Sequence, residues 1–550
     1  MKRILVIGGY GGFGARLSRR LAAAGHQVLV AGRSVEKALR FAATLSNAEG
    51  VVADREGDLA PVLAALAPDL VIDAAGPFQD SGYNVPEACI AAFIPYLDLA
   101  DARDFVTGIG ALDDAARAAG VTVIAGASTA PALTGAVARK LAEGLDRVDQ
   151  VEIALSASAR TTAGASVSRA ILSYVGRPVR LWRGGRWDER ARGWSEMRKV
   201  EMRAGLFALR GVGIFAPRRK VALADVPDHD LLPAMLPGRP AVTFRAGNDL
   251  GFQMRALWLL GWPVRWGWLT SLGGLAGLLL PLQRATARLG QDSSGMTVTL
   301  IGRRGEQAVE RRWTIVAVDD NGPEVPTLAA ALLVEALFGG VLRPGARTPE
   351  ALLELERFDQ ALEWLAVGGD IEERTLPPVL YARIMGPAFA TLPPLVRAIH
   401  DLHGDAGAAG EGKVERGRNL FARLLGAIAR FPPAGTHRLH VSFAERDGRE
   451  RWTRDFGGHL FSSELSERKG LAVERFGPMR FGFALAGTED GLTMTLKRWS
   501  AFGIRLPLFL APRIAAREWE AGERFHFDVR LSFPLIGCIV HYTGWLRPVR

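Results

Sequence analysis

Residues 1–34 of the chain read MKRILVIGGYGGFGARLSRRLAAAGHQVLVAGRS, and this stretch decides the fold of the N-terminal third. A short apolar run from Lys2 to Ile7 has the composition of a buried parallel strand. A glycine-rich turn follows, then a run that predicts a helix from about Phe13 to Ala24, and then a second strand from Gln27 to Ala31. This order is typical of a nucleotide-binding α/β domain, whereas a glycine-rich turn alone would also fit an unrelated α/β fold.

The turn fits the pattern G-x-G-x-x-G, with glycines at Gly9, Gly11 and Gly14. We expect Gly9 to form the tight turn out of the strand, and Gly11 to let a pyrophosphate approach the backbone. Gly14 would let the helix pack closely on the strand, and the helix N-terminus would direct its N–H groups at the phosphates. The sequence therefore predicts a dinucleotide site formed by the whole turn: Gly9, Tyr10, Gly11, Gly12, Phe13 and Gly14.

The end of the second strand indicates which dinucleotide binds. Sites for NAD usually carry an acidic residue about 20 positions after the turn, where it holds the ribose 2′-hydroxyl. This chain has Arg33 and Ser34 at that place, with no acidic residue beside Arg33. A guanidinium and a hydroxyl suit a 2′-phosphate, so we expect NADP(H). The alternative is that Arg33 is a solvated surface residue.

Strands and helices continue to alternate up to about residue 125. The expected elements are strands at 50–53, 96–99 and 121–125, a strand within PDLVIDAAGPF, and helices at 59–66, 85–92 and 112–119. This alternation predicts an α/β, Rossmann-like domain at residues 1–130 with a doubly wound parallel sheet. Ligands of such sheets bind beyond the carboxyl ends of the strands. The glycine turn, Arg33, Asp54 and the loop 75–78 should therefore share one rim, with Asp54 near the adenine.

Four segments within the first 140 residues resemble the NADP-binding domain of saccharopine-dehydrogenase-like oxidoreductases. They read GGYGGFG, VLVAGRS, VIDAAGPFQDSGYNVPEACIAAFIPYLDLAD and GASTAPALTGAVARKL. The resemblance implies that the loop after the fourth strand approaches the nicotinamide ring with Ala75, Gly76, Pro77 and Phe78. The fungal saccharopine reductases have Ser-Tyr in this loop and an Asp-Pro-Gly segment where this chain has GASTAPAL. The resemblance therefore does not extend to lysine biosynthesis.

The composition restricts the class of protein. A chain of 550 residues is long enough for two to four domains, and its two cysteines, Cys89 and Cys538, exclude a disulfide framework. The net charge is +10, but no nucleic-acid motif accompanies it, and the scattered histidines show no metal-binding spacing. We therefore expect neither a nucleic acid nor a metal as a partner. The N-terminus lacks the long apolar core of a signal peptide, which predicts a cytoplasmic protein, with the inner face of a membrane as an alternative location.

Residues 131–350 have the mixed strand and helix character of a second α/β domain, which we expect to bind the substrate and to mediate homodimer formation. This domain contains an apolar insertion at 256–283, and no charge occurs between Arg265 and Arg284. Four tryptophans cluster at one end of it: Trp258, Trp262, Trp266 and Trp268. Three interpretations stay open, namely a peripheral membrane or lipid-facing segment, a buried core or dimer interface, and a transmembrane helix.

Residues 376–550 begin with helices and continue as alternating strands, which predicts an α+β domain with an antiparallel barrel or a curved sheet. The stretch GDAGAAGEG near residue 404 is expected to be a flexible loop. This region resembles a domain of unknown function that often follows such NADP-binding modules, through LPPLVRAIHDLHG, RWTRDFGG, RFGPMRFGF and PLIGCIVHYTGWL. His400, Arg454 and His541 are candidates for a polar site, with structural roles as the favoured alternative.

These observations together predict an NADP(H)-dependent oxidoreductase of the saccharopine-dehydrogenase-like type that acts on an apolar or lipid-like small molecule. The alternative is a non-catalytic NADP(H)-sensing or lipid-binding protein, because no general acid can be identified from a motif. Tyr83, Asp98 and Asp101 are candidate proton donors by position alone. The catalytic residue stays unassigned at this level.

Overall fold

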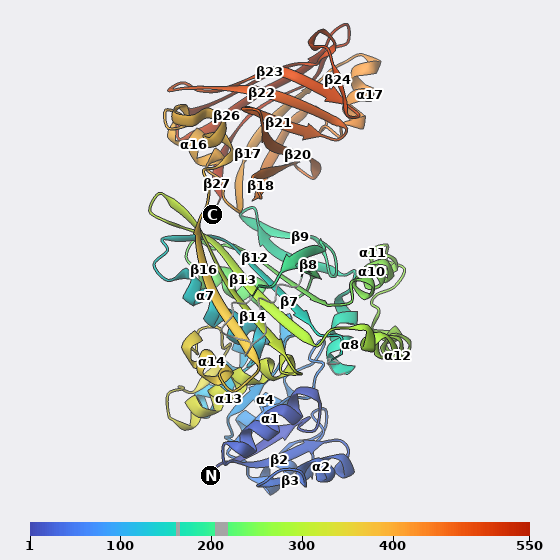
Figure 1. Ribbon diagram of the computed structural model, residues 1–550, viewed down its shortest axis with the longest axis vertical. Coiled ribbons are helices and arrows are strands. Elements are labelled where there is room, and N and C mark those ends of the chain that lie inside the picture. Colours follow the sequence, from blue (N-terminus) through green and yellow to red (C-terminus); the bar gives the residue numbers. More distant parts are fainter. Residues whose placement is uncertain (161–164, 204–217, 550) are drawn as a thin grey trace.

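The computed structural model describes residues 1–160, 165–203 and 218–549 of the chain. Three parts follow one another along the long axis: an N-terminal parallel sheet, a mixed sheet and a C-terminal barrel (Figure 1). The N-terminus lies at one end of the molecule, while the C-terminus lies between the barrel and the middle part (Figure 1). The predicted fold class is confirmed for all three parts.

The N-terminal sheet has seven parallel strands in the order β15-β6-β5-β4-β1-β2-β3. Its strands are β1 (Arg3–Ile7), β2 (Gln27–Gly32), β3 (Ala48–Val52), β4 (Leu70–Asp73), β5 (Tyr96–Asp98), β6 (Thr122–Ile124) and β15 (Gly345–Arg347). Its helices are α1 (Gly12–Ala23), α2 (Val35–Ala42), α3 (Ala60–Leu66), α4 (Asn84–Ala91), α5 (Arg103–Gly108), α6 (Asp113–Ala118), α7 (Thr134–Ala142), α13 (Val325–Phe338) and α14 (Leu355–Leu362). The chain order reverses between β1 and β4, and in sheets of this kind ligands bind beyond the carboxyl ends of the strands at that point.

Two apolar cores cover the two faces of this sheet. Side chains alternate along β1, so Ile4 and Val6 join one core while Leu5 and Ile7 join the other. The core around Ile4 and Val6 also contains residues of α1, α7 and α13 and continues into the middle sheet. The N-terminal sheet is therefore completed by a segment that returns after the middle part, since α13 packs on α1 and β15 pairs with β6.

The middle part is built on a seven-stranded sheet in the order β10-β11-β12-β7-β13-β14-β16. Only β7 and β12 pair in parallel among these strands. The strands are β7 (Arg147–Ala157), β10 (Arg198–Glu201), β11 (Arg218–Leu223), β12 (Ala241–Asn248), β13 (Ser293–Arg304), β14 (Gln307–Val318) and β16 (Val367–Thr375), and a separate hairpin consists of β8 (Pro178–Arg183) and β9 (Arg186–Arg192). Helices α8 (Ala165–Tyr174) and α9 (Asp228–Met235) complete this part.

The apolar insertion forms several short helices at one side of the middle part (Figure 1). They are α10 (Gly251–Leu260), α11 (Trp262–Arg265) and α12 (Ala276–Thr286). The uncharged interval after Arg265 is thus divided between a loop and α12, and it is not one continuous helix. No helix in the described ranges combines the length and the apolar character needed to cross a membrane.

The C-terminal part is an antiparallel sheet of eleven strands. They are β17 (Asp405–Arg416), β18 (Gly435–Arg446), β19 (Arg449–Phe456), β20 (His459–Arg468), β21 (Leu471–Phe476), β22 (Met479–Thr488), β23 (Gly491–Ala501), β24 (Ile504–Leu506), β25 (Arg513–Ala521), β26 (Arg524–Phe533) and β27 (Gly537–Val549). Pairing of β22 with β23 closes the sheet into a barrel and leaves β24 outside the ring. Helices α15 (Leu380–Met385) and α16 (Pro394–His400) pack into the barrel core, and α17 (Leu420–Ile428) follows β17.

One prediction in this region is wrong: the glycine-rich stretch near residue 404 is strand β17 and not a flexible loop. Its glycines are explained by close packing, because a Cβ at Gly410 would lie 2.0 Å from the Trp545 carbonyl oxygen of the neighbouring strand. A Cβ at Gly407 would collide with the backbone of Gly184, at the tip of the β8–β9 hairpin. Small residues therefore let the barrel contact the middle part backbone to backbone.

Candidate functional site

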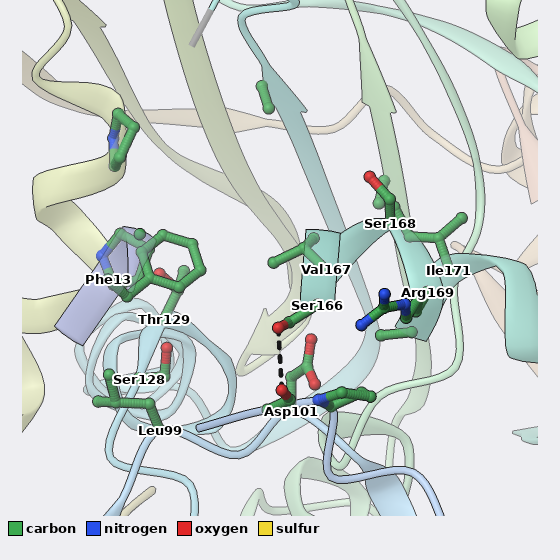
Figure 2. Close-up of a pocket in the computed structure, with 18 of the residues that line it drawn as sticks. Phe13, Leu99, Asp101, Ser128, Thr129, Ser166, Val167, Ser168, Arg169 and Ile171 are labelled. Atoms are coloured by element: carbon green, nitrogen blue, oxygen red, sulfur yellow. Dashed lines mark hydrogen bonds between the residues drawn. The ribbon is translucent and has the colours of Figure 1, made fainter. Parts of the chain in front are cut away.

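A cavity of about 1200 Å³ lies where the N-terminal and middle parts meet. Its rim on the N-terminal side is formed by residues that follow β1, β2, β3 and β4, which is the edge where a doubly wound sheet binds ligands. Its far wall is formed by the middle sheet and by α8, α10 and α12. Figure 2 shows a part of this cavity, with Phe13 on one side and α8 on the other.

The glycine turn has the shape that a phosphate site requires, although one role differs from the expectation. Gly8 has φ +75°, so it is Gly8 that adopts the left-handed backbone at the turn out of β1, a role that the sequence had suggested for Gly9. Gly14 allows the close approach of α1, because a Cβ there would lie 2.2 Å from the Gly8 carbonyl oxygen. No side chain caps the N-terminus of α1 at Gly11, which leaves the first N–H groups of the helix available to an anion.

Nine of the thirteen residues predicted to bind the cofactor line the cavity: Tyr10, Gly11, Gly12, Phe13, Arg33, Asp54, Ala75, Gly76 and Pro77. The other four, Gly9, Gly14, Ser34 and Phe78, are not part of its wall. Gly9 and Gly14 shape the turn from behind, while Ser34 caps α2 by accepting a hydrogen bond from the Lys37 N–H (3.4 Å). Phe78 is buried in the sheet core against Phe105, with 5.3 Å between the ring centroids.

The side of the rim expected to hold the 2′-phosphate contains Tyr10 and Arg33. The Tyr10 hydroxyl accepts a hydrogen bond from the Ser34 N–H (3.1 Å), and its ring lies against Gly32. Arg33 is exposed and borders the cavity. Asp54 is also exposed at this rim, where its carboxylate accepts a hydrogen bond from the Glu56 N–H (3.2 Å). The structure thus brings the predicted arginine and the predicted adenine contact to the same opening.

Comparison with known protein families agrees with this geometry. Residues 4–124 match the family described as Saccharopine dehydrogenase NADP binding domain. The N-terminal part is thus similar to NADP-binding domains of the saccharopine dehydrogenase type. Residues 392–546 match the family described as Domain of unknown function (DUF4166), which covers most of the barrel.

Solved structures give weaker likenesses to the chain. Amine dehydrogenase from Mycobacterium smegmatis is 12% identical over 64% of this chain and 95% of its own, with a TM-score of 0.35. A 3-ketoacyl-(acyl-carrier-protein) reductase from Brucella melitensis complexed with NADH is 18% identical over 22% of this chain and 73% of its own, with a TM-score of 0.20. These values are too low to support an inference about activity. No curated protein matches the sequence.

An ion pair that the sequence did not indicate holds the loop after β4 beside the glycine turn. The Asp73 carboxylate is fully buried at the end of β4, where it accepts hydrogen bonds from the Arg55 side chain (3.0 Å) and the Ala75 N–H (2.9 Å). Burial raises the pKa of Asp73, and the Arg55 charge opposes this rise. Arg55 also lies over the Phe78 ring and donates to Ser81 (2.9 Å). The pair therefore fixes the backbone of residues 74–78 at the cavity rim.

Only one of the three candidate proton donors reaches the cavity. The Tyr83 hydroxyl donates to the Phe105 carbonyl oxygen (2.8 Å), which is a structural role. Asp98 is fully buried and accepts hydrogen bonds from the N–H groups of Ala100 (2.9 Å) and Gly126 (2.7 Å), while burial raises its pKa to about 7. Asp101 lines the cavity, and burial raises its pKa, while the hydrogen bond from Gln79 opposes this rise. Asp101 is therefore the candidate that can touch a bound molecule.

Asp101 has two polar neighbours at the bottom of the cavity. The Gln79 amide donates a hydrogen bond to one oxygen of the Asp101 carboxyl group (3.3 Å). Ser166, at the start of α8, lies beside Asp101 in Figure 2 and donates to the Gly76 carbonyl oxygen (2.9 Å). That hydrogen bond joins the middle part to the loop after β4. Sequence patterns missed Gln79 and Ser166, because neither belongs to a recognisable motif.

Beyond these polar groups the cavity becomes an apolar chamber. Side chains of β7, β12, β14, α8, α10 and α12 form its walls, including Leu155, Phe244, Ile315, Ile171, Leu257 and Leu280. Some of the polar side chains there bond to one another: the Ser168 hydroxyl donates to Gln283 (3.1 Å), and the Gln253 amide donates to Thr286 (2.8 Å). A ligand in this chamber would meet hydrocarbon on most sides.

The candidate polar residues of the barrel do not form one site. His400 is fully buried and hydrogen bonded to Glu518 (2.6 Å), and its ring stacks on Trp452. Arg454 lies near the same Trp452 ring, with 5.3 Å between its guanidinium carbon and the ring centroid. His541 pairs separately with Asp528 (2.9 Å). These contacts give each residue a structural partner.

Proposed function

We propose that the protein is an NADP(H)-dependent oxidoreductase whose substrate is apolar or lipid-like. The observation that carries this proposal is a single cavity that runs from the glycine turn of the NADP-binding domain into an apolar chamber. Cofactor and substrate sites that share one cavity allow a hydride donor and its acceptor to meet away from water. The apolar chamber favours an acceptor with a hydrocarbon body and a small polar head.

The residues at the turn fit an NADP(H) molecule. The N-terminus of α1 has no side-chain cap, and Gly11 borders the cavity with no Cβ to obstruct a pyrophosphate. Arg33 and residues 75–77 line the same cavity, where Arg33 would bind the 2′-phosphate and residues 75–77 would border the nicotinamide. Bound cofactor supplies or accepts the hydride in such enzymes. We assign Gly9, Gly14, Ser34 and Phe78 indirect roles, because they support these groups from behind.

The chain would contribute proton handling and orientation. Burial raises the pKa of Asp101, and its carboxyl group would donate a proton from Oδ2 to an acceptor oxygen while Gln79 holds Oδ1. The Ser166 hydrogen bond to Gly76 keeps α8 against the loop and closes this end of the chamber. Apolar side chains on the remaining walls would exclude water from the reacting atoms.

Substrate-dependent oxidation of NADPH tests the proposal. A series of aldehydes or ketones with increasing alkyl chain length would show kcat/KM rising by about fourfold per buried methylene, which corresponds to about 0.8 kcal/mol. Ala256 is exposed at the cavity rim on α10, so a tryptophan at this position can narrow the chamber without disturbing the core. Ala256→Trp should abolish the gain for long chains and leave NADPH affinity unchanged.

Two results would contradict the proposal. Equal kcat/KM for short and long chains would exclude an apolar chamber as the substrate site. Tight NADPH binding without oxidation of any hydrophobic carbonyl compound would favour the alternative, a non-catalytic NADP(H)-sensing or lipid-binding protein.

A further inference from the structure

The helices of the insertion present an apolar outer face to solvent. This apolar face consists of the exposed large side chains from α10 to the end of α12 and just beyond: Phe252, Leu259, Leu260, Trp266, Trp268, Leu269, Leu275, Leu278, Leu282 and Leu289. Trp266 is 57% and Trp268 is 72% exposed, although both carry large aromatic rings. Large groups of exposed apolar side chains on soluble proteins usually mark contact with a protein or a membrane.

Aromatic and basic residues surround this apolar face. The rings of Trp258, Trp262, Trp266 and Trp268 pack in succession, with 5.5, 5.2 and 4.9 Å between neighbouring centroids. Arg265 lies over the first two rings. Residues 250–291 contain four arginines, at positions 255, 265, 284 and 288, and no acidic residue. Tryptophans and arginines around an apolar surface are the combination that suits the boundary between lipid headgroups and acyl chains.

The apolar face also borders the cavity. Phe252, Leu260 and Leu282 are exposed on this face, and all three also line the cavity. The inner sides of the same helices, including Leu257 and Leu280, form the wall of the apolar chamber. A molecule that leaves the cavity here would therefore meet hydrocarbon side chains on both sides of α10 and α12.

We propose that this apolar face docks on the surface of an anionic lipid bilayer, and that an apolar substrate passes from the acyl layer between α10 and α12 into the chamber. The entry of substrate from the bilayer rests on the proposed function, whereas docking does not. A second copy of the chain is a poorer partner for the face. A twofold interface would bring two copies of this basic segment together, with no acidic residue in the segment to neutralise the arginines.

Vesicle flotation of the full-length protein tests docking without cofactor or substrate. Vesicles of phosphatidylcholine alone are compared with vesicles that contain about 30 mol % phosphatidylglycerol, at low and at high salt. We expect binding to the anionic vesicles, weakened at least tenfold by high salt. Trp266→Ser/Trp268→Ser should reduce it at least tenfold, and Arg255→Glu/Arg284→Glu should remove the preference for anionic lipid.

A matched control comes from the barrel. Phe502 and Phe509 are 83% and 75% exposed, and Phe502→Ser/Phe509→Ser removes as many exposed aromatic rings from another surface. This control should float like the wild type, and all three double variants should keep wild-type NADPH affinity and circular dichroism. Docking is overturned if the wild type does not float with anionic vesicles, or if the control loses binding equally. A wild-type dimer that Trp266→Ser/Trp268→Ser dissociates, seen by light scattering, would instead make the face an interface between copies.

Substrate access is tested with one long-chain substrate presented in two ways. When the substrate is embedded in anionic vesicles, Trp266→Ser/Trp268→Ser should lower the rate of NADPH oxidation at least tenfold. When the substrate is dispersed in detergent, the same variant should work at the wild-type rate. If the variant and the wild type oxidise NADPH at equal rates in both presentations, access from the bilayer is overturned, even where the wild type floats with the vesicles. Absence of turnover by the wild type in either presentation would count against the proposed function, while flotation still decides docking.

Discussion

Arg33→Ala removes the charge that we expect to choose NADPH over NADH. Two unit charges about 4 Å apart attract by about 1 kcal/mol in water and by about 4 kcal/mol at an effective dielectric constant of about 20. Arg33 is exposed at the rim of the cavity, so its interaction with a 2′-phosphate belongs near the lower of these values. A phosphate with a charge between about −1.5 and −2 then gives about 1.4 to 2 kcal/mol, or a ten- to thirtyfold preference.

Calorimetry with NADPH and NADH on the wild type, Arg33→Ala and Arg33→Lys measures this preference. We expect Arg33→Ala to weaken NADPH binding about tenfold and to leave NADH binding unchanged. Arg33→Lys should keep part of the preference for NADPH over NADH. High salt should narrow the wild-type preference, because an exposed ion pair is screened. Equal affinities of the wild type for the two nucleotides would refute the reasoning, as would a parallel loss of NADH binding in Arg33→Ala.

Three further predictions concern other parts of the molecule. Gly11→Val should abolish nucleotide binding with native circular dichroism, because an added Cβ would meet the Gly8 carbonyl oxygen at 3.0 Å while the rest of the side chain enters the cavity; unchanged NADPH affinity would show that the turn is not the site. Asp101→Asn should lower kcat about 10²-fold or more at constant NADPH affinity and should remove the loss of rate with rising pH that deprotonation of a proton donor causes; a wild-type pH profile in the variant would exclude this role. Burial raises the pKa of Glu450 in the barrel from 4.5 to about 7, so the folded protein binds this proton more tightly than the unfolded chain. The free energy of unfolding therefore falls as pH rises from the lower pKa to the higher one. Glu450→Gln should therefore stabilise the fold at pH 8 by up to about 3 kcal/mol, seen as a higher melting temperature, and should not stabilise it near pH 4. An equal rise in melting temperature at pH 4 and pH 8 would contradict this prediction.

Patterns within short windows of sequence predicted the NADP-binding domain well. Helix α1 begins and ends within about one residue of the expected positions, because the glycine turn and Gly25 mark its ends. The role of Gly8 was missed because Gly8 and Gly9 are adjacent, and only the backbone dihedral angle shows which one turns left-handed. Phe78 follows Pro77 directly, yet its side chain points into the core while Pro77 borders the cavity.

Features that depend on contacts between distant residues could not be predicted in this way. Arg55 and Asp73 lie on different strand ends, and no local spacing indicates that they pair. The glycines of β17 look like a linker in sequence, because the Trp545 and Gly184 backbones that require them lie far along the chain. The chamber likewise depends on α10 and α12 folding over the middle sheet, which composition alone does not reveal.

The return of the chain to its first sheet has a consequence for how the protein can be divided. A fragment that ends at residue 130 would lack β15 and α13, so β6 would become an open edge and the apolar side of α1 would lose its cover. We expect such a fragment to aggregate. A fragment that ends at Thr375 would keep every strand of the N-terminal and middle sheets, because the strands of the barrel begin only at Asp405. The parts that fold together are therefore not simply consecutive segments of the sequence. The middle part is inserted between two segments that both belong to the N-terminal sheet, while the barrel follows as a separate C-terminal domain.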